Sequence, residues 1–157
     1  DNLKKNKGSV VLFSTVAVKQ GFPNHAIVSS AKGAIEGLTL ALAAEFAPNV
    51  RVNCIAPSLT NSKISNFLLK NEKVAEGIAK MHPMKRIGEG GDSASVAKFL
   101  LTDESSWITG QILGVDGGRS SVAWQFSKKQ LSNEHEKFIS NNFYSFVKHK
   151  FNGCGKW

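Results

Sequence analysis

Two short apolar runs flank a long stretch of helical periodicity near the start of the chain. Residues 8–15 read Gly-Ser-Val-Val-Leu-Phe-Ser-Thr, an apolar run with β-branched residues that predicts a strand buried on both faces. Residues 50–56 predict the next strand, which ends at Pro57. Two strands joined through a helix by short links favour a parallel βαβ unit with a right-handed crossover.

The segment between the two runs predicts one long helix, because its apolar residues recur at helical spacing. Asn24 is the expected N-cap, and Pro48 forces the helix to end near Ala47. Gly33 and Gly37 lie inside this helix. Glycine lowers helix stability, so these two residues predict close packing against another element.

The middle of the chain predicts further helices and one more strand. Residues 64–81 predict a helical stretch, and Asp92 or Ser93 is expected to cap a short helix that ends at Leu101. Residues 111–115 predict a last short strand, which an Asp-Gly-Gly sequence closes. Strands that alternate with helices in this way indicate the α/β class.

The C-terminal segment, residues 120–157, has a different composition, rich in Ser, Asn, Lys and Phe. Asn133 and Glu136 resemble a capping box, and the apolar positions that follow lie on one helical stripe. We therefore expect an amphipathic helix at about 133–150. Docking on its own domain is the expected role, with a second copy or a membrane surface as alternatives.

Composition narrows the class of protein. The chain has 157 residues, 41% of them hydrophobic and 20% charged, which is ordinary for a soluble globular domain. We expect no membrane-spanning segment, and we see no signal peptide. Because the first residue is not methionine, we expect that the chain is processed or is part of a longer parent. Two cysteines and no zinc-type spacing favour a cytoplasmic protein without a metal site. The net charge of +8 is dispersed, so nucleic acid is not expected as a partner.

Four motifs in order, at residues 8–15, 30–39, 51–57 and 108–118, resemble the short-chain dehydrogenase/reductase family. The resemblance runs almost continuously from about residue 4 to 119 and covers only the second half of such an enzyme. It implies a partial, Rossmann-like (doubly wound) parallel sheet in residues 1–119, followed by the tail at 120–157 with its added helix. The glycine-rich turn that holds a dinucleotide pyrophosphate in the first half of the family is not found in this sequence.

The same resemblance aligns the family's catalytic serine with Thr15, its tyrosine with Val28 and its lysine with Lys32. Residues four apart share a helix face, so a phenol at position 28 would lie beside the lysine and serve as a proton donor. Valine has no proton to give. His25 shares that face two turns before the lysine and is an alternative acid.

The resemblance also implies binding of NAD or NADP. Lys32 would hold the nicotinamide ribose, Pro57 and Ser58 stand where the family usually has Pro-Gly, and Thr60 and Ser62 fall where the nicotinamide amide is contacted. Each residue has an alternative as an ordinary strand-end, helix-surface or loop residue.

Three functions remain open at this point. By resemblance the chain is a member of the NAD(P)-dependent oxidoreductases that act on small alcohols and ketones, truncated and inactive as this chain alone. Alternatively, it is an assembly module that forms a homo-oligomer through the long helix and an exposed sheet edge. The third alternative is a degenerate fragment without a selected function.

Overall fold

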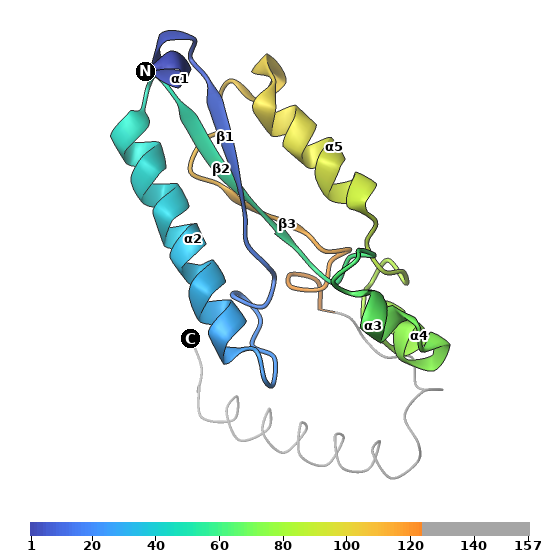
Figure 1. The fold of residues 1–157 in the computed structure, drawn as a ribbon. Coiled ribbons are helices and arrows are strands. Elements are labelled where there is room, and N and C mark those ends of the chain that lie inside the picture. The colour runs from blue at the N-terminus through green and yellow to red at the C-terminus, as the bar shows by residue number, and fades with distance from the viewer. Residues whose placement is uncertain (124–157) are drawn as a thin grey trace, which may run out of the picture. The chain divides into compact units, whose positions relative to one another are not determined.

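A small parallel sheet forms the centre of the fold (Figure 1). The computed structural model describes residues 1–123, and the first of the two units into which the chain divides spans Asp1–Val122. Its strands are β1 (Ser9–Phe13), β2 (Arg51–Pro57) and β3 (Ile112–Val115), in the order β1-β2-β3, with both pairs parallel. This arrangement confirms the predicted α/β fold. The part of the tail after residue 123, with its predicted helix at 133–150, lies outside the described residues.

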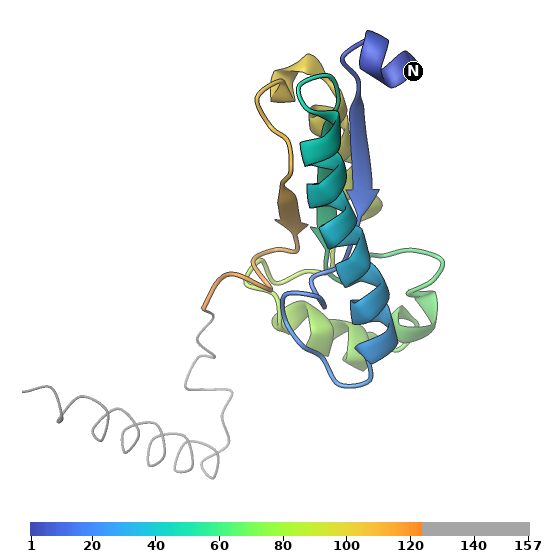
Figure 2. The same cartoon turned by 90° about the vertical axis from the view of Figure 1, so that its left-hand side faces the viewer.

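Helices cover both faces of this sheet. The covering helices are α2 (Ala26–Phe46) and α5 (Gly90–Leu101). The other helical elements are α1 (Asn2–Lys5), α3 (Asn66–Leu69), α4 (Glu72–Lys80) and the 3₁₀ turn η1 (Asp103–Ser105). Figure 1 shows α2 and α5 on opposite sides of the strands, and the view in Figure 2 shows α2 lying along the sheet. The result is a three-layer α/β/α arrangement, as the βαβ pattern predicts.

The core lies around the central strand β2, whose residues from Val52 to Ala56 are all buried. On one side Val52 packs with Val50 and with Ala43 of α2. Strand β1 was predicted to be buried on both faces, and this prediction is wrong. Its residues are half-buried and Phe13 is 45% exposed, because β1 pairs only with β2 within residues 1–123.

The opposite side of β2 is held by polar side chains. The guanidinium of Arg51 donates to the carbonyl oxygens of Leu100 and Thr102, at 3.0 Å each, and to Ser105 Oγ at 2.6 Å. These carbonyls lie at the end of α5, where backbone acceptors lack helical partners and where a positive charge is favourable. Asn53, fully buried, bonds the Ile108 carbonyl and the amide of Gln111. Together the two side chains tie α5 and the approach to β3 onto β2.

Several predicted helix boundaries need correction. Helix α2 begins after His25 and not after Asn24, because Asn24 adopts a positive φ of 62°, a conformation that Asn tolerates better than most residues. The single helix predicted at 64–81 is two helices, separated where Asn71 accepts a hydrogen bond from the amide of Val74 and caps α4. Asp92 is not the N-cap of α5 but its third residue; Glu89 is the N-cap, and the Asp92 carboxylate accepts from the Glu89 amide in a capping box.

The outer side of α2 is not covered within the described residues. A Cβ at Gly33 would meet Val18 at 3.7 Å, whereas one at Gly37 would meet nothing within 4 Å. The prediction of close packing therefore fails at Gly37 in this part of the chain.

Among residues 1–123, α2 alone has the length and hydropathy of a bilayer span, contrary to our expectation that no segment would. One side of α2 packs on β2 through Ala43. Nothing here tests a membrane partner, so its absence stays a prediction.

Candidate functional site

The loops that follow β1 and β2 meet at the carboxyl edge of the sheet. The amide of Ser14 donates to the Ile55 carbonyl at 2.8 Å, and the amide of Val16 donates to the Pro57 carbonyl at 3.1 Å. These two bonds place Thr15 beside the end of β2. Ligands of open parallel sheets bind at this edge.

Helix α2 brings Lys32 to the same edge. Lys32 Nζ donates to the carbonyl oxygen of Phe13 at 2.9 Å, and Ser29 Oγ donates to that of Ala17, also at 2.9 Å. Thr15 lies between these two carbonyls in the chain, and its hydroxyl oxygen accepts a bond from the Ala17 amide at 3.3 Å. The structure thus places Thr15 and Lys32 around one turn of chain, with 48% of Val28 exposed one helical turn before the lysine.

Sequence reasoning missed a buried polar pair next to this turn. Ser14, which is 5% exposed, donates from its Oγ to Glu36 Oε1 at 2.6 Å. Behind it lies Cys54, whose thiol pKa is raised by burial despite a hydrogen bond with Thr39. The available signal was that Glu36 follows Lys32 by four residues and shares its helix face.

Two of the remaining predicted cofactor residues, Thr60 and Ser62, use their side chains within the loop after β2. The hydroxyl of Thr60 donates to the Ser58 carbonyl at 3.0 Å, and Ser62 Oγ lies 3.1 Å from Ser65 Oγ. His25 is exposed, with Nδ1 2.8 Å from the Pro23 carbonyl. None of these contacts tests a role in cofactor binding, which stays a prediction for Pro57, Ser58, Thr60 and Ser62.

The chemistry of these groups suits one end of a dinucleotide. An ammonium has three N–H donors, and the bond to Phe13 uses one of those on Lys32, so ribose hydroxyls could take others. Within residues 1–123 we find no glycine-rich turn between a strand and a helix, which is the usual cradle for a pyrophosphate. The described residues fit the nicotinamide–ribose end and not the pyrophosphate. They also contain no group of three or more side chains suited to a metal.

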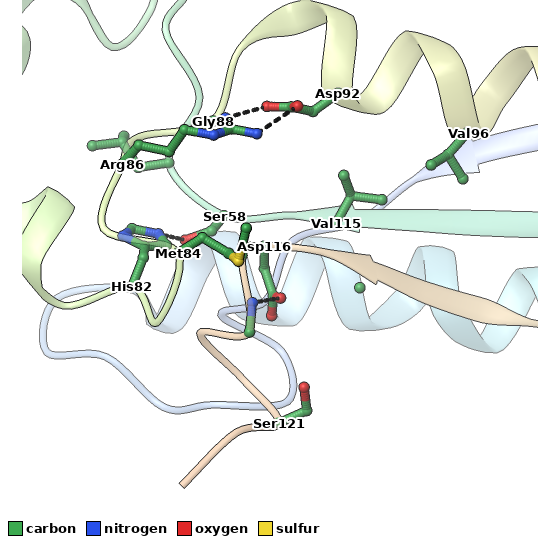
Figure 3. A pocket seen from close by; sticks show the side chains of 14 residues that line it. Ser58, His82, Met84, Arg86, Gly88, Asp92, Val96, Val115, Asp116 and Ser121 are labelled. Atoms are coloured by element: carbon green, nitrogen blue, oxygen red, sulfur yellow. Dashed lines mark hydrogen bonds and ion pairs between the residues drawn. The ribbon is translucent and has the colours of Figure 1, made fainter. Parts of the chain in front are cut away.

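A cavity of about 390 Å³ lies where β2 and β3 end (Figure 3). Ser58 Oγ lies 2.8 Å from His82 Nε2, and His82 Nδ1 lies 2.8 Å from the Ile78 carbonyl oxygen. His82 is buried, only 3% exposed, and each of its ring nitrogens has a hydrogen-bond partner. Its partner Ser58 directly follows β2, 24 residues earlier in the chain, so no local sequence pattern reveals this contact.

Asp116 lines the same cavity from the end of β3. Burial raises its pKa, but hydrogen bonds from the Ser120 hydroxyl and amide and from the Gly118 amide outweigh burial and hold the pKa below its ordinary value. The turn needs glycine at Gly117 and Gly118, with φ of 59° and 85°. Asp116 is therefore ionised near neutral pH.

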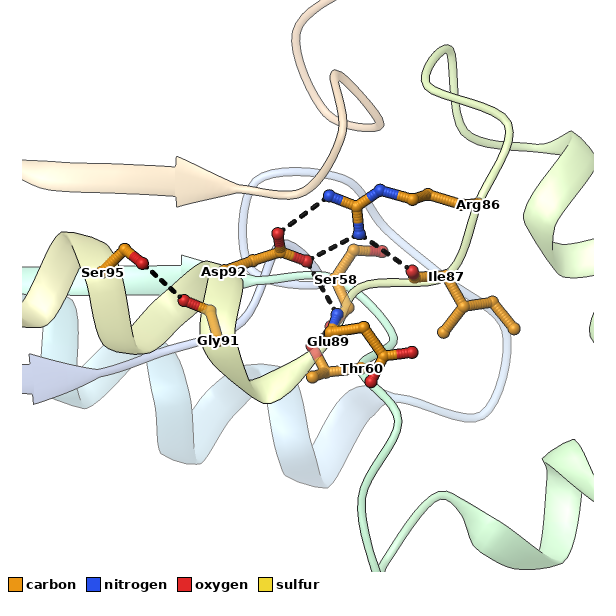
Figure 4. Close-up of polar contacts among 8 residues, drawn as sticks. All are labelled: Ser58, Thr60, Arg86, Ile87, Glu89, Gly91, Asp92 and Ser95. Atoms are coloured by element: carbon orange, nitrogen blue, oxygen red, sulfur yellow. Dashed lines mark hydrogen bonds and ion pairs between the residues drawn. The ribbon is translucent and has the colours of Figure 1, made fainter.

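An ion pair borders the cavity on the side of α5 (Figure 4). The two terminal nitrogens of Arg86 donate to the two carboxylate oxygens of Asp92 at 2.7 and 2.8 Å, and the Glu89 amide donates to Asp92 at 2.7 Å. The Arg86 bond and then the Glu89 bond lower the pKa of Asp92 to about 2. The ion pair lies at the start of α5. The loop before α5 contacts Thr60 through a bridge between Thr60 and Gly88.

The chain is similar to known proteins over most of its length. Residues 1–120 match the family described as enoyl-(acyl carrier protein) reductase. The chain is 42% identical over 118 residues to short-chain dehydrogenase/reductase SDRA of Arabidopsis thaliana, covering 73% of this chain and 46% of that protein. It is 40% identical over 113 residues to tropinone reductase-like 3 of Erythroxylum coca, covering 72% and 44%. The chain thus spans less than half the length of these curated relatives.

Solved structures show the same likeness. A short-chain type dehydrogenase/reductase from Mycobacterium ulcerans superimposes with a TM-score of 0.71 at 31% identity, over 75% of this chain and 43% of that one. ElxO with NADP bound gives a TM-score of 0.71 at 30% identity, over 77% and 50%. Because the family model matches residues 1–120 and the relatives and solved structures share this sequence and fold, the chain belongs to the short-chain dehydrogenase/reductase family of oxidoreductases.

Proposed function

We propose that residues 1–120 carry the carbonyl-binding and nicotinamide-facing half of an NAD(P)-dependent site for small alcohols and ketones, and that this chain alone does not turn over. The observation that carries the proposal is the contrast at one turn of α2. Lys32 is held at the end of β1, while the position one turn earlier holds Val28, which has no ionisable proton.

In this proposal each side chain has a separate task. The Thr15 hydroxyl donates to the substrate carbonyl oxygen, and Lys32 binds the ribose hydroxyls of the cofactor. When bound, the cofactor supplies or accepts the hydride. Val28 cannot protonate the alkoxide that forms on reduction, so the step that completes the alcohol has no acid from α2.

NAD and NADP both remain candidates for the cofactor. The similarity to ElxO with NADP bound supports a phosphorylated dinucleotide as the first one to test. We expect weak binding by this chain, because the described residues offer no pyrophosphate cradle. Reducing, cytoplasmic surroundings fit the free thiol of Cys54 and are part of the same proposal.

The test is consumption of NADH or NADPH at 340 nm with a panel of aldehydes and ketones. We expect no rate above that of buffer for the purified 157-residue chain. Fluorescence titration of NADPH in the same samples separates failure to bind from failure to react. Turnover that disappears in Lys32→Met would contradict the proposal, because it would show a working site without a phenol.

A second candidate function, self-association, is favoured by the outer side of α2. Ile27 is 87% exposed and Leu38 is 45% exposed. The same stripe of α2 also carries three exposed alanines, Ala31, Ala34 and Ala41. Small residues let a second helix approach closely, and exposed apolar stripes of this kind mark contacts between proteins. We propose a second copy of the chain as the partner.

Sedimentation velocity over a hundredfold range of concentration tests this second function. We expect a dimer or larger species for the native chain and a shift to monomer for Leu38→Glu. Lys73→Glu, a change of charge on α4, is the matched control and should leave the species unchanged. A monomer at all concentrations would exclude self-association through α2.

A further inference from the structure

The contact between Ser58 and His82 has the geometry of a nucleophile and its base. Ser58 Oγ and His82 Nε2 are 2.8 Å apart, within the 2.6–3.2 Å or so over which such pairs act. The histidine is held on its other side by the Ile78 carbonyl, also at 2.8 Å. Ser58 comes directly after strand β2, and His82 follows α4 in the chain.

The Ile78 contact fixes which nitrogen carries the proton. A carbonyl oxygen can only accept, so Nδ1 of a neutral His82 must be the protonated nitrogen that donates to it. The lone pair of Nε2 then faces Ser58, whose hydroxyl donates to it. This tautomer is the one that lets the imidazole take a proton from a serine that attacks.

The pair opens into the cavity at the ends of β2 and β3. Ser58 and His82 both line it, together with Asp116 and the apolar Met84, Val96 and Val115 (Figure 3). A volume of about 390 Å³ admits a small organic molecule. The cavity is separate from the turn that holds Thr15 and Lys32, so its chemistry does not depend on the residue at position 28.

A carboxylate lines the same cavity. The carboxylate of Asp116 accepts bonds from Ser120 and Gly118 and is ionised, and its field acts on His82. The arrangement brings a nucleophile, a base of defined tautomer and a carboxylate together from three separate segments of chain.

We propose that Ser58 and His82 form an acyl-transfer site for small, uncharged esters. Ser58 Oγ bonds to the ester carbonyl carbon while its proton moves to His82 Nε2. The bond from that carbon to the alcohol oxygen then breaks, and the alcohol leaves with the proton from His82. Water attacks the acyl-serine next, giving its proton to His82, and the carboxylic acid departs as the proton returns to Ser58 Oγ.

Two probes test the site on the whole chain. Phenylmethylsulfonyl fluoride should form an Oγ–S bond at Ser58 with loss of fluoride, and intact mass followed by peptide mapping identifies the modified residue. p-Nitrophenyl acetate should release p-nitrophenolate faster than buffer does. Ser58→Ala should abolish the adduct and reduce the release to background.

The base is tested by His82→Asn, whose amide can still donate to the Ile78 carbonyl but has no group in place of Nε2. General-base catalysis contributes about 10²–10⁴-fold, so sulfonylation should slow by at least about tenfold. Circular dichroism confirms that the variant folds. Ser95→Ala removes an exposed hydroxyl of α5 that does not line the cavity and is the matched control, which should react like the native chain.

Three results would overturn the proposal. These are no adduct above the Ser58→Ala background, an adduct on another residue, or an equal rate of sulfonylation in folded His82→Asn. Because neither probe involves a pyridine nucleotide, failure here leaves the proposed oxidoreductase role untouched, and the reverse also holds.

Discussion

Lys32 Nζ donates to the carbonyl oxygen of Phe13, which lies at the end of β1 and points away from β2. The lysine is thus held by the backbone of the sheet, independently of the side chain at position 28. A change at Val28 would meet an ammonium that is already in place. The site therefore lends itself to a test by restoring a phenol.

Val28→Tyr should give a tyrosine whose pKa lies below the usual value, because a nearby cation favours the phenolate. The position is 48% exposed, so water weakens the effect and we expect a shift of about one unit or less. Tyrosinate absorbance at 295 nm measures the titration. The native chain has a single tyrosine, Tyr144, whose curve can be subtracted.

Lys32→Met in the Val28→Tyr background is the control for that titration. It removes the ammonium and leaves the phenol, so the added tyrosine should titrate near the ordinary value of about 10. Equal titration curves with and without the lysine would show that positions 28 and 32 do not interact.

Arg51→Met should lower the free energy of unfolding by about 1.5–3 kcal/mol, the range for hydrogen bonds to a charged group. The change removes the donors for the Leu100 and Thr102 carbonyls and for Ser105. Urea denaturation followed by circular dichroism measures the loss. Lys98→Met, an exposed change on α5, should stay within about 0.5 kcal/mol; equal losses would mean that the guanidinium bonds contribute nothing specific.

Asp92→Asn should reduce thermal stability near neutral pH and make no difference in strong acid. The folded pKa of about 2 lies below the ordinary value of 3.8, so the carboxylate stabilises the fold above about pH 4, and this contribution is lost as the pH falls through about 2. The midpoint of thermal unfolding, measured from pH 6 to 2, should converge for the two proteins.

The cause of that pH dependence is tested with Arg86→Met, which removes the cation bound to Asp92. The difference between the midpoints of thermal unfolding at pH 6 and at pH 2 should be smaller in this variant too. If the difference between the native chain and Asp92→Asn were constant with pH, the carboxylate would not be the titrating group.

Val11→Pro should weaken any association through the outer edge of β1, which pairs with no other strand within residues 1–123, without breaking the β1–β2 pair. Gly8 accepts from Arg51 and Ser14 donates to Ile55, so even-numbered residues of β1 bond β2, and the Val11 amide points outward. Proline removes that outward donor. Sedimentation velocity should show less association for Val11→Pro.

Leu12→Pro is the counterpart, since the amide of Leu12 points toward β2. It should lose at least about 1 kcal/mol of stability through the lost ladder bond. Similar stability for Val11→Pro and Leu12→Pro would contradict the assignment of the outer edge.

The strands and the long helix were predictable because their signals are local. The apolar run at 51–57 and the helical spacing at 26–46 reflect burial against neighbours that any α/β sheet provides. The exposure of β1 could not be predicted, because it depends on which strand lies beside it. Asn24 was misplaced because its side chain suits both an N-cap and a positive φ, and only the structure decides between them.

The candidate sites differ in the same way. Thr15 and Lys32 were predicted from their spacing and family resemblance, and the structure places them at one turn of chain. The pair of Ser58 and His82 was missed, because 24 residues and two helices separate them in sequence. Contacts of this kind arise from how the loops return to the strand ends, which no short pattern records.

The three bonds of Arg51 have a consequence for how the chain opens. Because the Arg51 side chain joins β2 to the last turn of α5, that turn cannot unfold without breaking the hydrogen bonds of the guanidinium. We therefore expect α5 and β2 to open as one cooperative unit, with backbone amides at both places exchanging with deuterated solvent at a common, slow rate.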